Sequence, residues 1–392
     1  MSLLPRSSSL STNVPRILPA PWILQPVCKR SCARFLAIAT LVSASLAFAS
    51  AKREAQNKIG TATLTLGNCD ATGLAGGTCY RAVVSSCAEA PGQFVAVVKI
   101  NEPPDISLLQ GTVFFTTGGT GAALYDYDQD FLGDSRCSGS NCGLMTVESI
   151  NSANYRTVQV EFVDPEGIVS EPDGWLTGPA TDGPRALACR YATVVHAVWA
   201  LLLKKDTTHP VCATGNSGGG ALVGYAITQY GMGNANGPGP ELTLAEPTSG
   251  PPYARIDQGC AGAAAPISTV SCPAGDQISE DYGLTTATDF VDPAYPSDVC
   301  TIDINSNGTN PYKNFHHDSV LSDDDAAPNY HTVVRSLFGS DDLTEAVPLG
   351  LEWYNAITSN KSGACVAGAP HELPENFDGA SQIVTDVTSL CK

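Results

Sequence analysis

The segment VCATGNSGGGALVGYAITQYG, residues 211–231, constrains the fold of this chain more than any other stretch. A short apolar run, Val211-Cys212-Ala213, leads into Gly-Asn-Ser-Gly-Gly, and an apolar run with helical spacing follows at once. This order predicts a buried strand that ends abruptly, a tight turn that carries Ser217, and a helix that starts directly behind the turn. Small residues on both sides of Ser217 let the backbones of strand and helix approach each other closely.

The flanking sequence alternates between expected strands and expected helices. Apolar runs predict strands at 94–100, 111–117, 156–163, 210–214, 242–246 and 333–338, and helical spacing predicts helices at 144–154, 186–203, 221–230 and 379–390. Such alternation predicts an α/β fold, with a mostly parallel sheet covered by helices on both faces. Residues 247–330 are rich in Pro, Gly, Asp and Cys and are expected to form an inserted lid. The main domain then comprises residues 50–246 and 331–392.

The N-terminus has the pattern of a secretory signal. Residues 1–34 are basic and contain no acidic residue, and the apolar run 35–49 is too short to span a bilayer comfortably. We therefore expect residues 1–49 to be a signal peptide and the mature protein to be extracellular, without stable membrane association. A signal anchor and a transit peptide are alternatives for the same stretch.

Charge and cysteine content limit the partners. A formal net charge of −18 argues against nucleic acid and anionic membranes as partners, because both repel a negative surface. Twelve of the 14 cysteines lie beyond the leader, which predicts up to six disulfides of undetermined pairing; Cys189 with Cys212 is one candidate pair. Asn307 and Asn360 begin glycosylation sequons.

No cofactor or metal is expected. Cysteine and histidine lack the paired spacing of a zinc site. Asp126-x-Asp128-x-Asp130 resembles the start of a calcium loop, but Phe131 stands where that loop needs glycine. Neighbouring His316 and His317 could in principle bind a metal, but in a strand they would point to opposite faces.

Two families of serine enzymes contain a motif like that around Ser217. In a trypsin-like protease the serine lies near the C-terminus and an Ala-His-Cys motif precedes it, whereas here a long stretch follows Ser217 and no such motif precedes it. The strand, turn and helix pattern instead resembles the nucleophile elbow of the α/β-hydrolase superfamily, Gly-x-Ser-x-Gly. The resemblance covers most of residues 90–392 in element order.

This resemblance implies roles for other residues, in the chain order nucleophile, acid, histidine. Ser217 would be the nucleophile and His371, in Gly-Ala-Pro-His-Glu, the base. Phe-Gly-Ser-Asp-Asp offers two acids after the strand at 333–338, of which Asp342 is preferred to Asp341; Glu246 is a further candidate. The oxyanion hole would use the backbone N–H of Gly218 and a donor from the glycine-rich turn 118–121, for which we favour Gly119.

The expected function is hydrolysis of a small-molecule or polymeric carboxylic ester by a secreted serine hydrolase. A peptidase on the same scaffold is an alternative, because the same catalytic groups serve amides. A hydrolase-like binding protein without catalysis is another, and an acyltransferase a third. The sequence alone does not rank the substrates.

Overall fold

One mixed sheet organises the part of the chain that the structure describes. This computed structural model describes residues 59–69, 73–163, 174–177, 183–234, 237–261, 281–306, 312–322 and 331–392. The predicted leader and the sequon at Asn307 lie outside these residues. All described residues belong to one unit, Gln56–Lys392.

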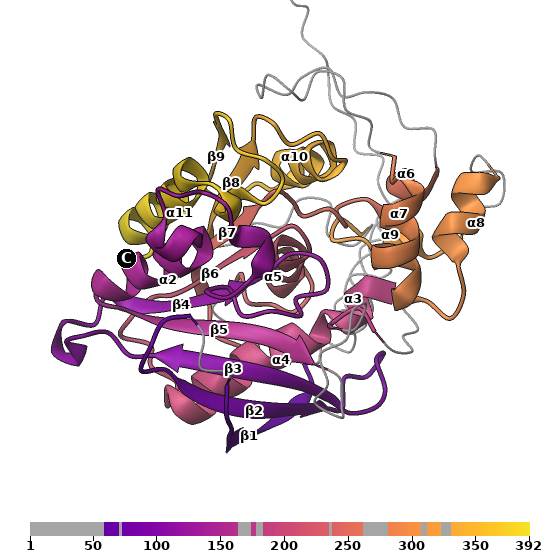
Figure 1. Ribbon diagram of the computed structural model, residues 1–392. Helices are drawn as coiled ribbons and strands as arrows, with labels where there is room; N and C mark the ends of the chain where they lie inside the picture. Colours follow the sequence, from indigo (N-terminus) through magenta and orange to yellow (C-terminus); the bar gives the residue numbers. More distant parts are fainter. Residues whose placement is uncertain are drawn as a thin grey trace, which may run out of the picture. The chain divides into compact units, whose positions relative to one another are not determined.

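The sheet has nine strands in the order β1-β2-β3-β5-β4-β6-β7-β8-β9 (Figure 1). The first four in this order pair antiparallel, and all pairs from β5 to β9 are parallel. The strands are β1 (Thr61–Leu66), β2 (Thr78–Ser85), β3 (Phe94–Asn101), β4 (Gly111–Thr116), β5 (Tyr155–Val163), β6 (Val211–Asn216), β7 (Leu242–Thr248), β8 (Val333–Gly339) and β9 (Lys361–Val366).

Hydrophobic cores lie on both faces of this sheet. Every residue of the central strands β4 and β6 is buried, and successive side chains point to opposite faces, so Phe114 joins one core and Phe115 the other. Helices α4 (Cys189–Ala197) and α5 (Gly218–Thr228) contribute to the core of Phe114. Helices α2 (Cys142–Ser152) and α11 (Phe377–Leu390) contribute to the core of Phe115. The predicted architecture, a mostly parallel sheet with helices on both faces, is confirmed.

Several elements depart from the predicted pattern. The apolar run at 186–203 is divided into α3 (Gly183–Leu187), α4 and a π-helical turn, Val198–Leu202. Strands β1, β2 and β9 and helix α10 (Ala346–Ala356) were not predicted. The strands β1 and β9 form the two edges of the sheet and are largely exposed or half-buried, so they lack the apolar runs that marked the central strands.

The region between β7 and β8 contains short helices in its described parts. These are α6 (Ile256–Ala261), α7 (Leu284–Thr286), the helical turns Ala287–Val291 and Asp292–Ala294, α8 (Val299–Asn305) and α9 (Phe315–Asp318). A disulfide joins Cys260 of α6 to Cys300 of α8. Whether this region acts as a lid stays a prediction.

Four more disulfides join described residues: Cys69–Cys79, Cys87–Cys189, Cys137–Cys142 and Cys212–Cys391. The suggested pair Cys189–Cys212 is therefore wrong. The physical reason is the alternation of side chains along β6: Cys212 points into the core of Phe115, whereas Cys189 lies in the core on the other face. Among the described residues, no helix is long and apolar enough to cross a bilayer.

Candidate active site

Ser217 occupies a tight turn between β6 and α5, at the centre of the sheet. Its backbone has φ 49° and ψ −113°, a conformation that costs an ordinary L-residue free energy. The surrounding structure holds it there: the Ser217 N–H donates to the carbonyl of Thr248 at 2.8 Å, and the Ser217 carbonyl accepts from the Ala221 N–H at 2.9 Å. The turn therefore projects the serine hydroxyl beyond the end of the strand.

Glycine is required on both sides of this turn because the backbones nearly touch. A Cβ added to Gly215 would lie 2.6 Å from the carbonyl carbon of Gly219, and one added to Gly219 would lie 2.5 Å from the carbonyl oxygen of Thr117. Real Cβ atoms do not approach backbone so closely. Any side chain at these positions would push the strand and the helix apart and move Ser217.

His371 and Asp342 lie beside Ser217, although 154 residues separate the serine from the histidine in sequence. His371 Nε2 is 2.9 Å from Ser217 Oγ, and His371 Nδ1 is 2.9 Å from Asp342 Oδ2. With the proton of the neutral imidazole on Nδ1, His371 donates to Asp342 and accepts from the serine hydroxyl. Asp342 follows the end of β8 and His371 follows β9, so both reach the carboxyl edge of the parallel sheet.

The structure distinguishes the two candidate acids. The side chain of Asp342 is buried, and the N–H and Oγ1 of Thr344 donate to its Oδ1 at 2.9 and 2.7 Å, which leaves Oδ2 for His371. Asp341 is exposed, and its Oδ1 accepts from Ser340 Oγ at 3.0 Å. The geometry thus brings Asp342 to the histidine, in agreement with the sequence preference.

Glu246, the remaining acid candidate, lies inside β7 and not in a loop after it. It is fully buried, and no hydrogen bond links it to His371 in the described part of the chain. Burial raises the pKa of this carboxyl group well above its usual range, and the negative charge of Asp386 acts in the same direction. Burial therefore disfavours the negative charge on Glu246, and this side chain makes no hydrogen bond to His371.

The charges around His371 raise its pKa above the ordinary value. Burial alone would lower the pKa, because it penalises the charged imidazolium. The hydrogen bond that His371 donates to Asp342 and the negative charges of Asp342, Glu372 and Glu345 outweigh this effect. The imidazole is therefore a stronger base than a free histidine.

Two glycines, Gly218 and Gly119, line the pocket beside the serine. Gly218 is the first residue of α5, so its N–H has no acceptor within the helix. Gly119 has φ +52° and lies in a turn that the Gly121 N–H closes onto the Gly118 carbonyl at 2.9 Å. Both Gly218 and Gly119 line the same pocket as Ser217.

The sequence did not point to Asn216, which connects three parts of the site. Its Oδ1 accepts from Thr248 Oγ1 at 2.9 Å and from the Leu373 N–H at 3.3 Å. The residue before the serine thereby attaches the segment after His371 to the elbow. Its place in Gly-x-Ser-x-Gly offered no signal, because that position accepts many residue types.

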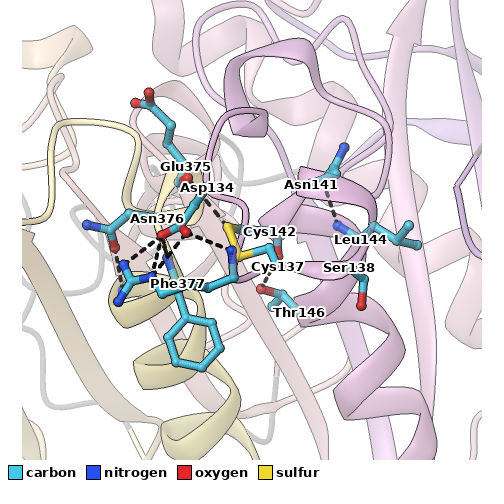
Figure 2. Close-up of a disulfide and its surroundings, with 12 residues drawn as sticks. Asp134, Cys137, Ser138, Asn141, Cys142, Leu144, Thr146, Glu375, Asn376 and Phe377 are labelled. Atoms are coloured by element: carbon cyan, nitrogen blue, oxygen red, sulfur yellow. Dashed lines mark hydrogen bonds and ion pairs between the residues drawn. A yellow bond between two sulfur atoms is a disulfide. The ribbon is translucent and has the colours of Figure 1, made fainter.

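A disulfide loop holds the other end of the histidine segment. Cys137 and Cys142 are bonded at the start of α2, and Oδ2 of Asp134, just before this loop, accepts from the N–H of Phe377 at 3.0 Å (Figure 2). Cys142 Sγ lies 3.4 Å from the carbonyl oxygen of Glu375. Asp134, Cys137 and Cys142 also form the single cluster with metal-ligand spacing among the described residues, but the disulfide occupies both sulfurs.

The acidic motif at residues 126–130 and the histidine pair at residues 316–317, neither of which was assigned to a metal site, have local partners. Asp126 Oδ2 accepts from Lys99 Nζ at 2.7 Å, and Asp128 Oδ1 accepts from the Asp130 N–H at 3.0 Å. His316 and His317 lie in α9, not in a strand, and their Nδ1 atoms are 3.2 and 3.3 Å from carboxylates of Asp257 and Asp318.

A pocket of about 480 Å³ opens above Ser217 and His371. Its walls come from the turn at 117–123, the loop at 128–131, the segment at 286–290 between β7 and β8, and the residues after β8. The volume suffices for a small organic group.

Comparisons with known proteins find similarity in structure only. No known protein family and no curated protein matches the sequence. A cold-adapted esterase from an Arctic intertidal metagenomic library shares 12% identity over 84% of this chain and 100% of its own, with a TM-score of 0.43. Dienelactone hydrolase from Anabaena variabilis shares 10% identity over 80% of this chain and 96% of its own, with a TM-score of 0.41. An alpha-beta serine hydrolase homologue from Coxiella burnetii shares 10% identity over 75% of this chain and 92% of its own, with a TM-score of 0.38.

The fold assignment rests on the molecule's own topology. The sheet is parallel from β5 to β9, a strained serine turn follows its central strand β6, and a helix begins immediately behind the serine. The chain has the α/β-hydrolase fold, as its sequence predicted.

Proposed function

We propose that this protein hydrolyses carboxylic esters with Ser217 as nucleophile, His371 as general base and Asp342 as the acid that orients the histidine. The proposal rests on one observation: a continuous chain of two hydrogen bonds, each 2.9 Å long, from Ser217 Oγ through the imidazole to Asp342. A serine hydroxyl needs such a base because it is a weak nucleophile at neutral pH.

In the first half of the reaction, Ser217 Oγ forms a bond to the acyl carbon and its proton moves to His371 Nε2. Asp342 stabilises the resulting imidazolium through the Nδ1–H bond. The N–H groups of Gly218 and Gly119 hydrogen-bond the oxyanion of the tetrahedral intermediate. When that intermediate collapses, the bond to the alcohol oxygen breaks, and the alcohol takes the proton from His371.

In the second half, water attacks the acyl-enzyme. His371 accepts a proton from the water as the new bond forms, and returns it to Ser217 Oγ as the ester bond to the serine breaks. The products are a carboxylate, an alcohol and regenerated enzyme.

We also propose that the protein acts outside the cell. Its disulfides support this, because disulfides persist in oxidising compartments and are rare in reducing ones. Detection of the processed chain in the culture medium of the native host, with an N-terminus near residue 50, is the expected result.

Turnover of nitrophenyl acyl esters and of peptide anilides by the purified protein tests the reaction. We expect ester turnover, lowered by roughly 10⁴-fold or more in Ser217→Ala. Ser389→Ala is the matched control, since Ser389 is exposed on α11, and should retain the wild-type rate. Anilide turnover with no ester turnover would favour a peptidase, and a folded protein inactive on both would contradict the proposal.

A further inference from the structure

Acidic side chains predominate among the charged residues that line the pocket above Ser217. Its lining includes five carboxylates and, among the described residues, neither lysine nor arginine; the carboxylates are Asp128, Asp130, Asp289, Glu345 and Glu372. His371 is the one lining side chain that can become positively charged. A hydrolase pocket for an acidic ester would need the opposite distribution.

No lysine or arginine after residue 58 lines this pocket. Every lysine and arginine after residue 58 is among the described residues, and none lines the pocket. Arg255 follows the lining residues Pro252 and Tyr253 closely in sequence, but its guanidinium pairs with Asp257 at 2.7 Å and with Glu352 at 2.8 Å.

The carboxylates come from four separate parts of the pocket wall. Asp128 and Asp130 lie in the loop after β4, Asp289 in the helical turn 287–291, and Glu372 beside His371. Glu345 lies after β8 at the start of α10, and burial raises the pKa of its carboxyl group. Because these carboxylates line one space from different sides, their contributions to a negative electrostatic potential add at the position of a bound substrate.

Aromatic side chains share the same wall. Phe131, Tyr253 and Phe290 line the pocket, and Phe290 approaches to 3.2 Å of the position that a Cβ on Gly119 would take. Aromatic rings attract ammonium groups through the negative charge of their faces. Carboxylates and aromatic rings together make an environment that favours a quaternary or protonated amine and disfavours a carboxylate.

We propose that the pocket selects esters that carry a positively charged ammonium group and rejects esters that carry a carboxylate. The inference rests on the proposed ester hydrolysis and names its substrate class. The same charges assist turnover, since hydrolysis of a cationic ester releases a carboxylate that the walls repel. A cationic ester here means an ester whose alcohol part or acyl part carries a positively charged amine.

Three acetate esters of similar size test the selection. Acetylcholine carries a quaternary ammonium, neohexyl acetate has carbon in place of that nitrogen, and acetoxypropanoate carries a carboxylate. Acid release in a pH-stat measures kcat/KM for each at low and at high salt. We expect acetylcholine to exceed neohexyl acetate by roughly tenfold or more at low salt, with a smaller ratio at high salt. Acetoxypropanoate should be hydrolysed slowest.

Matched variants locate the charges responsible. Asp289→Asn removes one negative charge from the pocket wall, and the double variant with Asp130→Asn removes two. Each should lower the ratio of acetylcholine to neohexyl acetate, the double variant further. Asp298→Asn removes the same charge from an exposed position outside the pocket and should leave the ratio unchanged.

The outcomes separate the two proposals. Equal kcat/KM for the cationic and the neutral ester at low salt, or a ratio that Asp289→Asn and the double variant do not change, would overturn the selection while ester hydrolysis stands. If the folded protein hydrolyses neither nitrophenyl acetate nor any of the three acetate esters, ester hydrolysis itself is overturned, and the selection with it.

Discussion

At the residue scale, the site consists of a few groups whose positions the backbone enforces. Sequence reasoning named Ser217, His371 and Asp342 from their order in the chain and, for Ser217 and Asp342, from the predicted strands before them. The structure brings these three side chains together. Sequence reasoning missed Asn216 and Thr344, which position Leu373 and Asp342, because single polar residues in loops carry no pattern. Contacts of this kind become visible only when the loops are brought together in space.

The two neighbouring acids should differ sharply in their effect on activity. Asp342→Asn keeps the size of the side chain but removes the charge that stabilises the imidazolium, so kcat should fall by roughly 10³- to 10⁴-fold. Asp341→Asn, on the exposed neighbour, should change kcat less than twofold. Steady-state kinetics on a neutral ester measures both variants, and equal losses would contradict the assignment of Asp342.

The pH profile should reflect the environment of His371. Burial lowers its pKa, but the hydrogen bond to Asp342 and the surrounding carboxylates raise it by more than burial lowers it. The net shift of the pKa is therefore upward. Only the neutral imidazole accepts a proton, so activity is lost as pH falls through the raised pKa. The acid limb of kcat/KM should therefore lie above about 6.5, the ordinary histidine value. In Asp342→Asn the limb should move to lower pH; a limb unchanged by this substitution would contradict the account.

At the scale of elements, apolar runs predicted the buried strands and not the edges. The fully buried strands β4 and β6 were found from their continuous apolar sequence. Edge strand β9 contains Lys361 and Gly363 and is mostly half-buried, so neither an apolar run nor clear alternation marked it. Disulfide pairing was also undetermined, because it depends on which face of the sheet each cysteine occupies.

The disulfide between Cys212 and Cys391 should contribute more to stability than the one between Cys69 and Cys79. The first closes a loop of 179 residues and attaches α11 to the central strand, whereas the second closes a loop of 10. In the chain-entropy view, longer loops gain more from closure. Cys212→Ala with Cys391→Ala should lower the free energy of unfolding by about 3–5 kcal/mol, measured in urea. The pair Cys69→Ala with Cys79→Ala is the control, and a larger loss there would contradict the expectation.

At the scale of the whole molecule, the sheet brings together residues that are distant in the chain. The carboxyl ends of parallel strands meet at one edge, so the turn after β6, the acid after β8 and the histidine after β9 converge there. The order of strands and helices therefore predicted both the fold and the location of the site. The charge of the pocket wall was not predictable, because its five carboxylates come from four segments whose paths the sequence does not specify.

The central claim is that Ser217 is a nucleophile activated by His371, and reaction with a fluorophosphonate tests it most directly. Peptide mapping by mass spectrometry locates the adduct on the folded protein, with Ser217→Ala and His371→Ala treated in parallel. The account predicts one phosphonyl group on Ser217 in the wild type, none in Ser217→Ala, and slow labelling in His371→Ala. An unlabelled wild type, or an adduct on another residue, would contradict it.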